Sequence, residues 1–370
     1  MRRLLITTEG KGDVEAAKTA TGLLIFAPQD VVGVVDSTAA GMSVADAFGV
    51  NHPAPIFGSV RDAARHGAAA THLVIGLAPS GGRLSPALRA HVVEAIEEGL
   101  SIISGLHTPL AEDPELAHRA RARGVSMDDV RQPPPDIPVG SMRVLDWPVR
   151  RVLTIGTDCN VGKMSTSIRL VEGLNEAGAD AVFVPTGQTG IMIAGWGIAV
   201  DRVISDFVTG AAELLIERVR DRGIAVVEGQ GGILHPGFSA VTLGLLHGVL
   251  PEAMILCHKA GRERYRHTEA RILPPREMVE LYERIVAPLY PGRVVGCSLN
   301  TRQMPADQAQ QEIARWRAAT GLPVVDPFRD GVAPLVRAVQ DRLGSAREPL
   351  GTSRACELEA PRSSEVASEG

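Results

Sequence analysis

GTDCNVGKMS, residues 156–165, is the stretch of this 370-residue chain that decides its fold. It follows the apolar run RVLTI at 151–155 and opens a segment with helical periodicity, so it joins a strand to a helix. Its glycines let several backbone N–H groups point at one anion, and the start of the helix adds partial positive charge. Lys163 supplies a full positive charge to the same anion. The stretch therefore predicts a phosphate-binding loop; the alternative is a glycine-rich turn that carries its lysine by chance.

The spacing within this loop differs from the common phosphate-loop pattern. Five residues, not four, separate Gly156 from Gly162, and Met164 stands where a hydroxyl usually ligates magnesium. Ser165 or Thr166 must supply that ligand if a magnesium ion is bound. We expect the phosphates of a cofactor to contact the whole loop, that is, Gly156, Thr157, Asp158, Cys159, Asn160, Val161, Gly162, Lys163, Met164 and Ser165.

Apolar runs alternate with helical patterns on both sides of the loop. Continuous runs of valine, isoleucine and leucine separated by helices are typical of parallel sheets buried on both faces. We therefore predict an α/β protein, with a Rossmann-like domain followed by a doubly wound P-loop NTPase-like domain. Strands are expected at 4–7, 31–35, 73–76, 101–104, 151–155, 181–185, 224–227, 253–257, 293–299 and 322–325, and helices at 84–100, from the loop to about 177, and at 207–221, 275–285, 306–320 and 331–343.

A proline-rich segment divides the chain. QPPPDIPVG at 132–140 disfavours both helix and interior strand, because proline fixes φ and lacks an N–H donor. We expect the Rossmann-like domain at 1–140 and the P-loop domain at 141–344. Beyond 344, serine, glutamate, arginine and small residues dominate, which predicts a disordered tail at 345–370.

Composition limits the classes of function. The net charge of −5 lacks the basic excess that nucleic-acid binders usually carry. No apolar run is long enough to cross a bilayer, and the run at the N-terminus is too short for a signal peptide. The four cysteines form no CxxC pair, so neither a disulfide framework nor a zinc knuckle is indicated. We expect a cytoplasmic protein with a small-molecule amino-acid or carboxylate substrate, and with neither nucleic acid nor membrane as partner.

Two further segments follow predicted strands, at the sheet edge where ligands bind in α/β proteins. TGQTG at 186–190 offers Thr186, Gln188 and Thr189 as substrate-binding groups, and the alternative is a plain connecting loop.

The second of these segments is HKAGRERYRH at 258–267. Its Lys259 and Arg262 suit a carboxylate or phosphate, which arginine can bind in bidentate fashion. His258 is positioned to act as general base for an amine. The alternative is a solvated charged loop.

An acidic pair lies in GIAVDRVISDFV at 197–208. On one helix Asp201 and Asp206 would point roughly 140° apart, so they share a site only if Asp201 ends a strand. Asp206 is then a catalytic candidate, because a carboxylate near a phosphate loop commonly holds a metal ion or a water. Alternatively, Asp206 caps the helix that follows it.

Other groups follow no spacing rule. PSGG at 79–82 and His107 could face the same crevice. Cys159 could act as a nucleophile at a helix N-terminus, but no histidine partner follows from spacing, and packing is the preferred interpretation. Lys18 and Thr19 lack a preceding glycine loop of the right form, and we interpret them as structural.

The loop resembles the GTDxxVGK loop of dethiobiotin synthetase, an ATP-dependent enzyme with the same five-residue spacing. VEGQGG at 227–232 resembles that family's VEGxGG segment, and Asn300 in SLNT matches its adenine-reading Asn. The resemblance covers the second half of the chain only. It implies phosphate contact by Lys163, metal binding by Asp158 and Glu228, and the possibility of a homo-oligomer.

Segments of both halves resemble a two-domain family long labelled as of unknown function. They are KTATGLLIFAPQDVVGVVDSTAAG at 18–41, and GTDCNVGKMST, VEGQGG, LCHKAGR and SLNT in the second half. Members of that family place Met after the loop Lys, as Met164 does here. The family includes D-glutamate N-acetyltransferases, so the resemblance implies an enzyme that forms an amide bond on an amino acid.

Three functions remain open, with ATP or acyl-CoA as the cofactor. In an N-acyltransferase, Lys163 and the loop amides would hold phosphates, and Arg262 would hold the amino acid's carboxylate. His258 or an acidic residue would then remove the amine proton, so Lys163, His258 and Asp206 are the catalytic candidates. The second function is an ATP-dependent ligase or kinase using Mg²⁺, and the third is a non-catalytic nucleotide-binding regulator.

Overall fold

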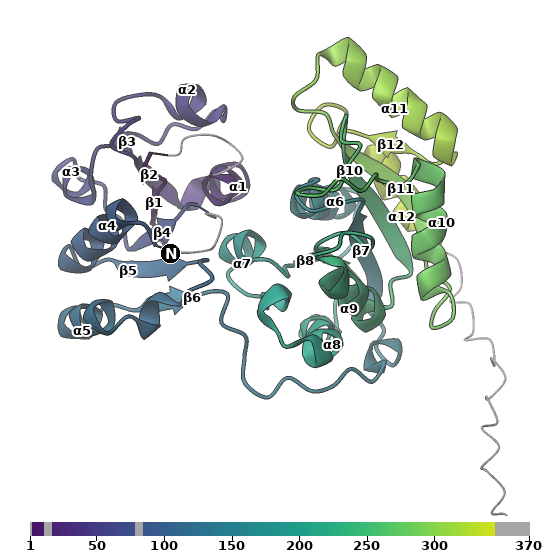
Figure 1. Cartoon of the computed structure of the whole chain (residues 1–370), viewed down its shortest axis with the longest axis horizontal. Coiled ribbons are helices and arrows are strands. Elements are labelled where there is room, and N and C mark those ends of the chain that lie inside the picture. Colours follow the sequence, from purple (N-terminus) through teal and green to yellow (C-terminus); the bar gives the residue numbers. More distant parts are fainter. Residues whose placement is uncertain (1, 11–16, 78–83, 345–370) are drawn as a thin grey trace, which may run out of the picture.

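The computed structural model describes residues 2–10, 17–77 and 84–344, which form two α/β domains (Figure 1). Each domain is built on a parallel sheet of six strands within the described residues. The predicted fold class is confirmed: a Rossmann-like domain precedes a doubly wound P-loop domain.

The first sheet has the order β3-β2-β1-β4-β5-β6, which is the strand order of a Rossmann unit. The order reverses between β1 and β4. The strands are β1 Leu4–Thr7, β2 Val31–Val35, β3 Ile56–Phe57, β4 His72–Ile75, β5 Ser101–Ser104 and β6 Met127–Asp129. The helices are α1 Lys18–Phe26, α2 Val44–Phe48, α3 Val60–Arg65, α4 Pro86–Glu97 and α5 Pro114–Arg123.

The second sheet has the order β12-β11-β10-β7-β9-β8, and its order reverses between β7 and β10. The strands are β7 Arg150–Gly156, β8 Ala181–Val184, β9 Ile224–Val227, β10 Ala253–Lys259, β11 Arg293–Asn300 and β12 Val324–Val325. The helices are α6 Lys163–Glu176, α7 Gln188–Ala194, α8 Val208–Glu217, α9 Ser239–Val249, α10 Pro275–Val286, α11 Ala306–Thr320 and α12 Ala333–Gly344.

The strands are apolar on both faces because helices cover both faces of each sheet. In β7, Leu153 and Ile155 pack into the core beneath α8, α9 and α10, whereas Val152 packs on the opposite face with α6 and α12. Successive residues of a strand point to opposite faces, so a continuous apolar run fills both cores.

The predicted strands and helices lie within a few residues of their observed bounds. The sequence patterns missed helices α1, α2, α3, α5, α7 and α9 and the short strands β3 and β6. These helices are short or have small residues on the packed face, so their apolar periodicity is weak. The predicted nest at 79–82 and the predicted tail at 345–370 lie outside the described residues.

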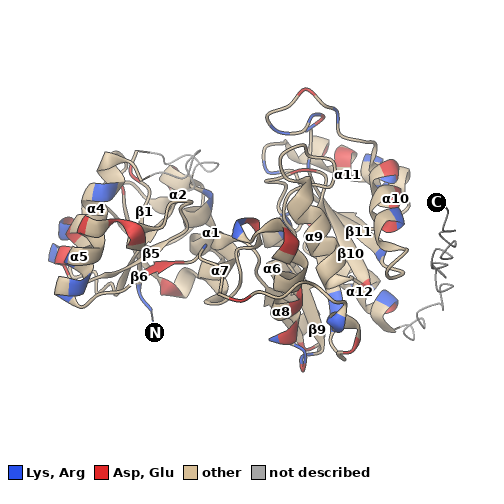
Figure 2. Cartoon of the chain, turned by 60° about the horizontal axis from the view of Figure 1, so that its bottom comes forward, with Lys and Arg blue, Asp and Glu red and all other residues tan. Residues whose placement is uncertain are grey.

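The two domains contact each other mainly through α1 and α7, which lie side by side (Figures 1 and 2). Thr19 Oγ1 of α1 lies 3.0 Å from Thr189 Oγ1 of α7. Arg2 donates a 3.0 Å hydrogen bond to the carbonyl oxygen of Ile193. These contacts bring the beginning of α1 to the carboxyl edge of the second sheet.

Acidic and basic residues both occur along the outer helices α4, α5 and α10 (Figure 2). Ion pairs such as Arg89–Asp113 at 2.6 Å and Arg276–Glu280 at 3.0 Å lie there. Among the described residues, no helix is both long and apolar enough to cross a membrane.

Candidate functional site

The phosphate loop joins β7 to α6 at the carboxyl edge of the second sheet, where the strand order reverses. Asn160 and Gly162 have positive φ angles of 53° and 105°, a conformation that Asn and Gly adopt most readily. The N–H groups of Asn160, Val161 and Gly162 have no acceptor among the described residues. Unpaired donors therefore gather at the start of a 14-residue helix, an arrangement that binds phosphate.

Lys163, the first residue of α6, places its ammonium inside the loop. Nζ donates hydrogen bonds to the carbonyl oxygens of Asp158 at 2.8 Å and Gly231 at 2.7 Å. The residue is only 7% exposed, and this burial lowers the pKa of its ammonium. A Cβ on Gly156 would lie 2.7 Å from Nζ, so glycine at that position leaves room for the lysine. Lys163 thus lies against the loop amides, where the sequence places it.

Asp158 is fully buried, and its carboxylate accepts hydrogen bonds from groups of the protein. Oδ1 accepts a 2.6 Å hydrogen bond from the N–H of Cys159. Oδ2 accepts hydrogen bonds of 2.9 Å from Arg262 Nη1 and from the N–H of Arg266. Oδ2 accepts two hydrogen bonds, whereas Oδ1 accepts one and keeps a second acceptor site, so the role of Asp158 as a metal ligand stays a prediction.

Arg262 lies beside the loop, as expected, but its guanidinium is directed at the loop itself. Besides Asp158, it donates a 2.7 Å hydrogen bond to the carbonyl oxygen of Cys159. These contacts use Nη1 and fix the 258–267 segment on the loop, while the role of Arg262 in holding a substrate carboxylate stays a prediction. Lys259 is the last residue of β10 and is partly exposed at the same edge.

Asn300 ends β11 next to the phosphate loop. Its Cβ lies 3.9 Å from the position that a Cβ on Gly162 would take. Its Oδ1 accepts a 3.2 Å hydrogen bond from the N–H of Arg302. Asn300 therefore lies beside the loop, and its contact with a nucleotide stays a prediction.

Two hydroxyls follow the loop lysine on α6, and they differ in availability. Thr166 Oγ1 donates to the carbonyl oxygen of Gly162 at 2.9 Å and lies 2.7 Å from Ser298 Oγ. Ser165 is partly exposed, and its hydroxyl has no hydrogen-bond partner among the described residues. Of the two hydroxyls, that of Ser165 is therefore the available one, and its role as a magnesium ligand stays a prediction.

Glu228 follows β9 and is 8% exposed. Its Oε2 accepts hydrogen bonds from the N–H groups of Thr186 at 3.1 Å and Gly187 at 3.2 Å, whereas Oε1 has no donor among the described residues. Burial raises the pKa of this carboxyl to about 7. Glu228 can therefore exchange a proton near neutral pH, or offer its open oxygen to a cation.

His258 lies in the core of the domain rather than facing a ligand. It is 4% exposed, its Nδ1 lies 2.9 Å from Thr157 Oγ1, and its ring stacks on Trp316 with centroids 4.6 Å apart. Burial lowers the pKa of the imidazole to about 4. The predicted role as general base is corrected, because the neutral ring is enclosed between the loop and α11.

Asp158, Cys159 and His235 place their donor atoms within 4.8 Å of one another, as a metal site requires. His235 has no free nitrogen, since Nδ1 accepts from the N–H of Gly237 at 3.0 Å and Nε2 donates to the carbonyl oxygen of Arg266 at 2.9 Å. Burial also raises the pKa of the Cys159 thiol. The cluster is therefore bonded internally, and Cys159 is a poor nucleophile.

The TGQTG segment is not a loop, because α7 begins at Gln188. The hydroxyl of Thr186 is buried and donates to a backbone carbonyl at 2.7 Å. Thr189 pairs with Thr19, and Gln188 Oε1 accepts a 2.6 Å hydrogen bond from Arg131. The three predicted substrate-binding side chains therefore make contacts within the protein, two of them between domains.

Arg131 is a residue that the sequence analysis missed. It follows β6, is 4% exposed, pairs with the Asp201 carboxylate and lies 3.1 Å from His107 Nδ1. Its Nε has no hydrogen-bond partner among the described residues. The sequence feature that could have identified Arg131 is its position just after a strand, at the edge of the first sheet where ligands bind in α/β proteins.

Asp206 is exposed in the 3-10 helix Ser205–Phe207. Its Oδ1 lies 3.4 Å from Ser205 Oγ, and Phe207, not Asp206, stands at the N-cap of α8. Asp206 therefore does not cap α8. Its catalytic role required Asp201 to end a strand, whereas Asp201 lies in a 3-10 helix.

Met164, which was expected to contact the cofactor, is directed at the first domain. Its Cε lies 3.4 Å from the position of a Cβ on Gly22 of α1. The Met164 side chain therefore lies at the contact between the domains, and its contact with the cofactor stays a prediction.

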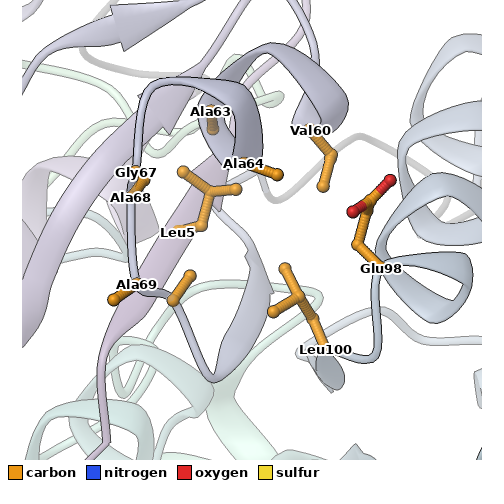
Figure 3. Close-up of a pocket in the computed structure, with 10 residues that line it drawn as sticks. Leu5, Val60, Ala63, Ala64, Gly67, Ala68, Ala69, Glu98 and Leu100 are labelled. Atoms are coloured by element: carbon orange, nitrogen blue, oxygen red, sulfur yellow. The ribbon is translucent and has the colours of Figure 1, made fainter.

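A cavity of about 280 Å³ lies in the first domain, between α3 and the end of α4 (Figure 3). Small aliphatic residues line it, with Glu98 as the charged member. The cavity offers no cation or row of backbone donors for a phosphate, and it is not part of the site around the loop.

Two family models match the chain. The Rossmann-like domain described as a domain of unknown function (DUF1611_N) matches residues 37–133, and the P-loop domain of the same description (DUF1611_C) matches residues 138–336. The crystal structure of a DUF1611 family protein from Anabaena variabilis ATCC 29413 is similar at a TM-score of 0.87 and 36% identity, and it covers 92% of this chain and 100% of that one.

Two curated relatives bear the name D-glutamate N-acetyltransferase. The relative from Pseudoalteromonas sp is 39% identical over 280 residues, which cover 75% of this chain and 83% of the relative. The relative from Tritonibacter scottomollicae is 35% identical over 334 residues, which cover 88% of this chain and 95% of the relative. With both domains matched, the chain belongs to the DUF1611 family of two-domain P-loop proteins.

Proposed function

We propose that this protein is an N-acyltransferase that forms an amide on the amine of an amino acid, with acetyl-CoA as donor and D-glutamate as acceptor. One observation carries the proposal: a phosphate cradle built around Lys163 lies within electrostatic reach of Glu228, a buried carboxyl that titrates near neutral pH. The relatives named D-glutamate N-acetyltransferase supply the reaction class.

In this reaction the amine nitrogen attacks the carbonyl carbon of the thioester. A C–N bond forms, the C–S bond breaks, and the sulfur of CoA leaves with the electron pair. The amine gives up a proton and the sulfur gains one. Glu228 is suited to accept the amine proton, because a carboxyl with a pKa of about 7 can gain and lose a proton near neutral pH.

The phosphate loop serves the donor in this proposal. Lys163 and the unpaired amides of Asn160, Val161 and Gly162 would hold phosphate groups of CoA. Binding energy from these remote groups positions the thioester for attack.

A second candidate is an ATP-dependent ligase or kinase. The open hydroxyl of Ser165 and the open oxygen of Glu228 fit a magnesium ion, and Asn300 lies beside the loop. The ion would neutralise charge on the phosphates of a bound nucleotide.

Product analysis separates the two candidates. We expect protein incubated with acetyl-CoA and D-glutamate to release N-acetylglutamate and free CoA in equal amounts, with no dependence on ATP. Formation of ADP that requires both substrates would replace the acyltransferase with a ligase. Absence of any acylated amino acid across a panel of D- and L-amino acids would refute the proposal.

A further inference from the structure

Helix α1 is fixed on the P-loop domain near its N-terminus. Thr19 and Thr189 share a buried 3.0 Å hydrogen bond. A Cβ on Gly22 would lie only 2.7 Å from Thr189 Cγ2, so the absence of a side chain at Gly22 lets α1 approach α7 this closely. Met164 Cε of α6 lies 3.4 Å from the same Cβ position.

Helix α1 is also fixed at its other end. The guanidinium of Arg169 on α6 lies 5.4 Å from the ring centroids of both Phe26 and Phe328, in cation–π contact with each. Phe26 is the last residue of α1, whereas Phe328 belongs to the P-loop domain. Contacts at both ends define the position of α1 relative to the phosphate loop.

Lys18 is the first residue of this helix and stands four residues before Gly22. Residues spaced by four lie on the same face of a helix, so Lys18 is on the face that meets the second domain. The groups that act on the pKa of its ammonium include Cys159 and Glu228 of the P-loop domain, which raise it, and Arg266 and Arg131, which lower it.

The ammonium of Lys18 has no hydrogen bond or ion pair with another described residue. Lys18 is exposed to solvent. Neighbouring protein atoms still lower the pKa of its ammonium by desolvation. Two neighbouring arginines are already paired, Arg262 with Asp158 and Arg131 with Asp201 and Gln188.

We propose that Lys18 is a substrate-binding residue that the first domain contributes to the site, and that it binds a carboxylate of the amino-acid acceptor. This inference rests on the proposed function, because it takes the acceptor to be an amino acid. It assigns to Lys18 the role that the sequence suggested for Arg262.

The chemistry of an amino acid favours this assignment over a phosphate. The phosphate loop already supplies its own cation, Lys163, and unpaired amides. An amino acid carries its amine and its α-carboxylate on one carbon, so it needs a proton acceptor and a cation close together. Glu228 acts electrostatically on the Lys18 ammonium, and the two residues belong to different domains. An ammonium and a carboxylate form a charge-assisted hydrogen bond, among the stronger polar contacts.

Calorimetric titration of full-length protein tests the assignment, with D-glutamate and acetyl-CoA as separate probes. The variants are Lys18→Met, which removes the charge and keeps the length, and Lys18→Arg, which restores a cation. Arg123→Met is the matched control, because Arg123 is exposed at the end of α5 on the outer side of the first domain. Equal melting temperatures for all four proteins show that the fold is retained.

We expect Lys18→Met to raise the Kd of D-glutamate about tenfold or more, as the loss of a charged hydrogen bond does. The Kd of acetyl-CoA should stay within about twofold, Lys18→Arg should recover part of the affinity, and Arg123→Met should match the wild type. In turnover assays the KM for D-glutamate should rise more than kcat falls.

Three results would overturn the assignment: weaker binding of acetyl-CoA rather than D-glutamate, unchanged affinity for both probes, or no binding of D-glutamate by the wild type. The proposed function fails separately. If D-glutamate binds in a Lys18-dependent way but no acetylated product forms, Lys18 is confirmed as a carboxylate-binding residue and the proposed acyltransferase activity is refuted.

Discussion

Arg262 Nη1 lies 2.9 Å from Asp158 Oδ2, so two residues 104 positions apart neutralise each other at the phosphate loop. The Asp158 carboxylate is fully buried and also holds the N–H groups of Cys159 and Arg266. The pair fixes the segment after β10 on the loop.

The first prediction concerns this pair. Arg262→Met leaves a buried carboxylate without its counter-charge, and we expect a loss of about 3 kcal/mol in the free energy of unfolding. Adding Asp158→Asn should recover part of the loss, because the buried charge is then removed. Urea unfolding measures both. An unchanged free energy of unfolding together with a raised KM for the amino acid would return Arg262 to a substrate-binding role.

The second prediction concerns Lys163. Lys163→Met removes the only charge that the loop directs at a phosphate, and we expect ligand affinity to fall by roughly 10- to 100-fold. The melting temperature of the wild type should rise on addition of acetyl-CoA, because a ligand that binds the native state stabilises it. That rise should be absent in the variant at the same concentration. An equal rise in the melting temperature of Lys163→Met would show that acetyl-CoA does not bind at the loop.

The third prediction concerns pH and His258. Burial lowers the pKa of His258 to about 4 from an ordinary value of 6.5, so the unfolded chain binds more protons between these values. The resulting stability is fully present above about pH 6.5 and is lost as the pH falls toward 4, by at most about 3 kcal/mol.

His258→Asn supplies the control for this measurement. Asparagine keeps a polar group for Thr157 but does not titrate, so the variant should lose less stability than the wild type between pH 6.5 and 4. Unfolding free energies over this range give the comparison. Parallel curves for the two proteins would contradict the assignment of a neutral, enclosed imidazole.

The fourth prediction concerns Glu228. Glu228→Gln keeps an oxygen for the N–H groups of Thr186 and Gly187, and we expect kcat/KM to fall by about 10²- to 10⁴-fold. The wild-type rate should rise with pH through about 7, and this rise should vanish in the variant.

Stability should move in the opposite direction from activity in the same variant. The native carboxyl has its pKa raised from 4.5 to about 7, so it costs stability as the pH rises through that range. Glutamine removes this cost, and Glu228→Gln should unfold at higher urea concentration than the wild type at pH 8. A variant that loses both activity and stability would indicate a structural role only.

The fifth prediction concerns the contact between domains. In most helices Gly→Ala is favourable by about 1 kcal/mol, but a Cβ on Gly22 would meet Thr189 Cγ2 at 2.7 Å. We therefore expect Gly22→Ala to destabilise the protein and to raise the KM for the amino acid, because α1 carries Lys18. Increased stability with an unchanged KM would argue against close docking of α1.

The sequence predicted the fold because each central strand is a continuous apolar run and each run is followed by a glycine-rich turn or a helix. It also predicted the position of the loop and of VEGQGG. In that segment a Cβ on Gly229 would lie 1.7 Å from the carbonyl oxygen of Thr154, so its glycine reflects close backbone packing. The sequence patterns missed helix α1 because its buried residues include Thr19, Ala20 and Gly22, which are too small to give a clear apolar periodicity.

The roles of charged side chains could not be predicted from the sequence. His258, Asp158 and Arg262 all lie at the expected sheet edge, but their hydrogen-bond partners come from distant segments and occupy them. The contribution of Lys18 depends on how two domains dock, and no local pattern encodes that geometry.

The most direct test of the central claim follows the acetyl carbon. Acetyl-CoA labelled with ¹³C in the acetyl group is incubated with D-glutamate in buffer without ATP, and the products are observed by NMR. We predict transfer of the label to the amine, one free CoA thiol for each amide formed, and loss of transfer in Lys163→Met. Absence of labelled amide in the wild type, or transfer that persists unchanged in Lys163→Met, would contradict the account.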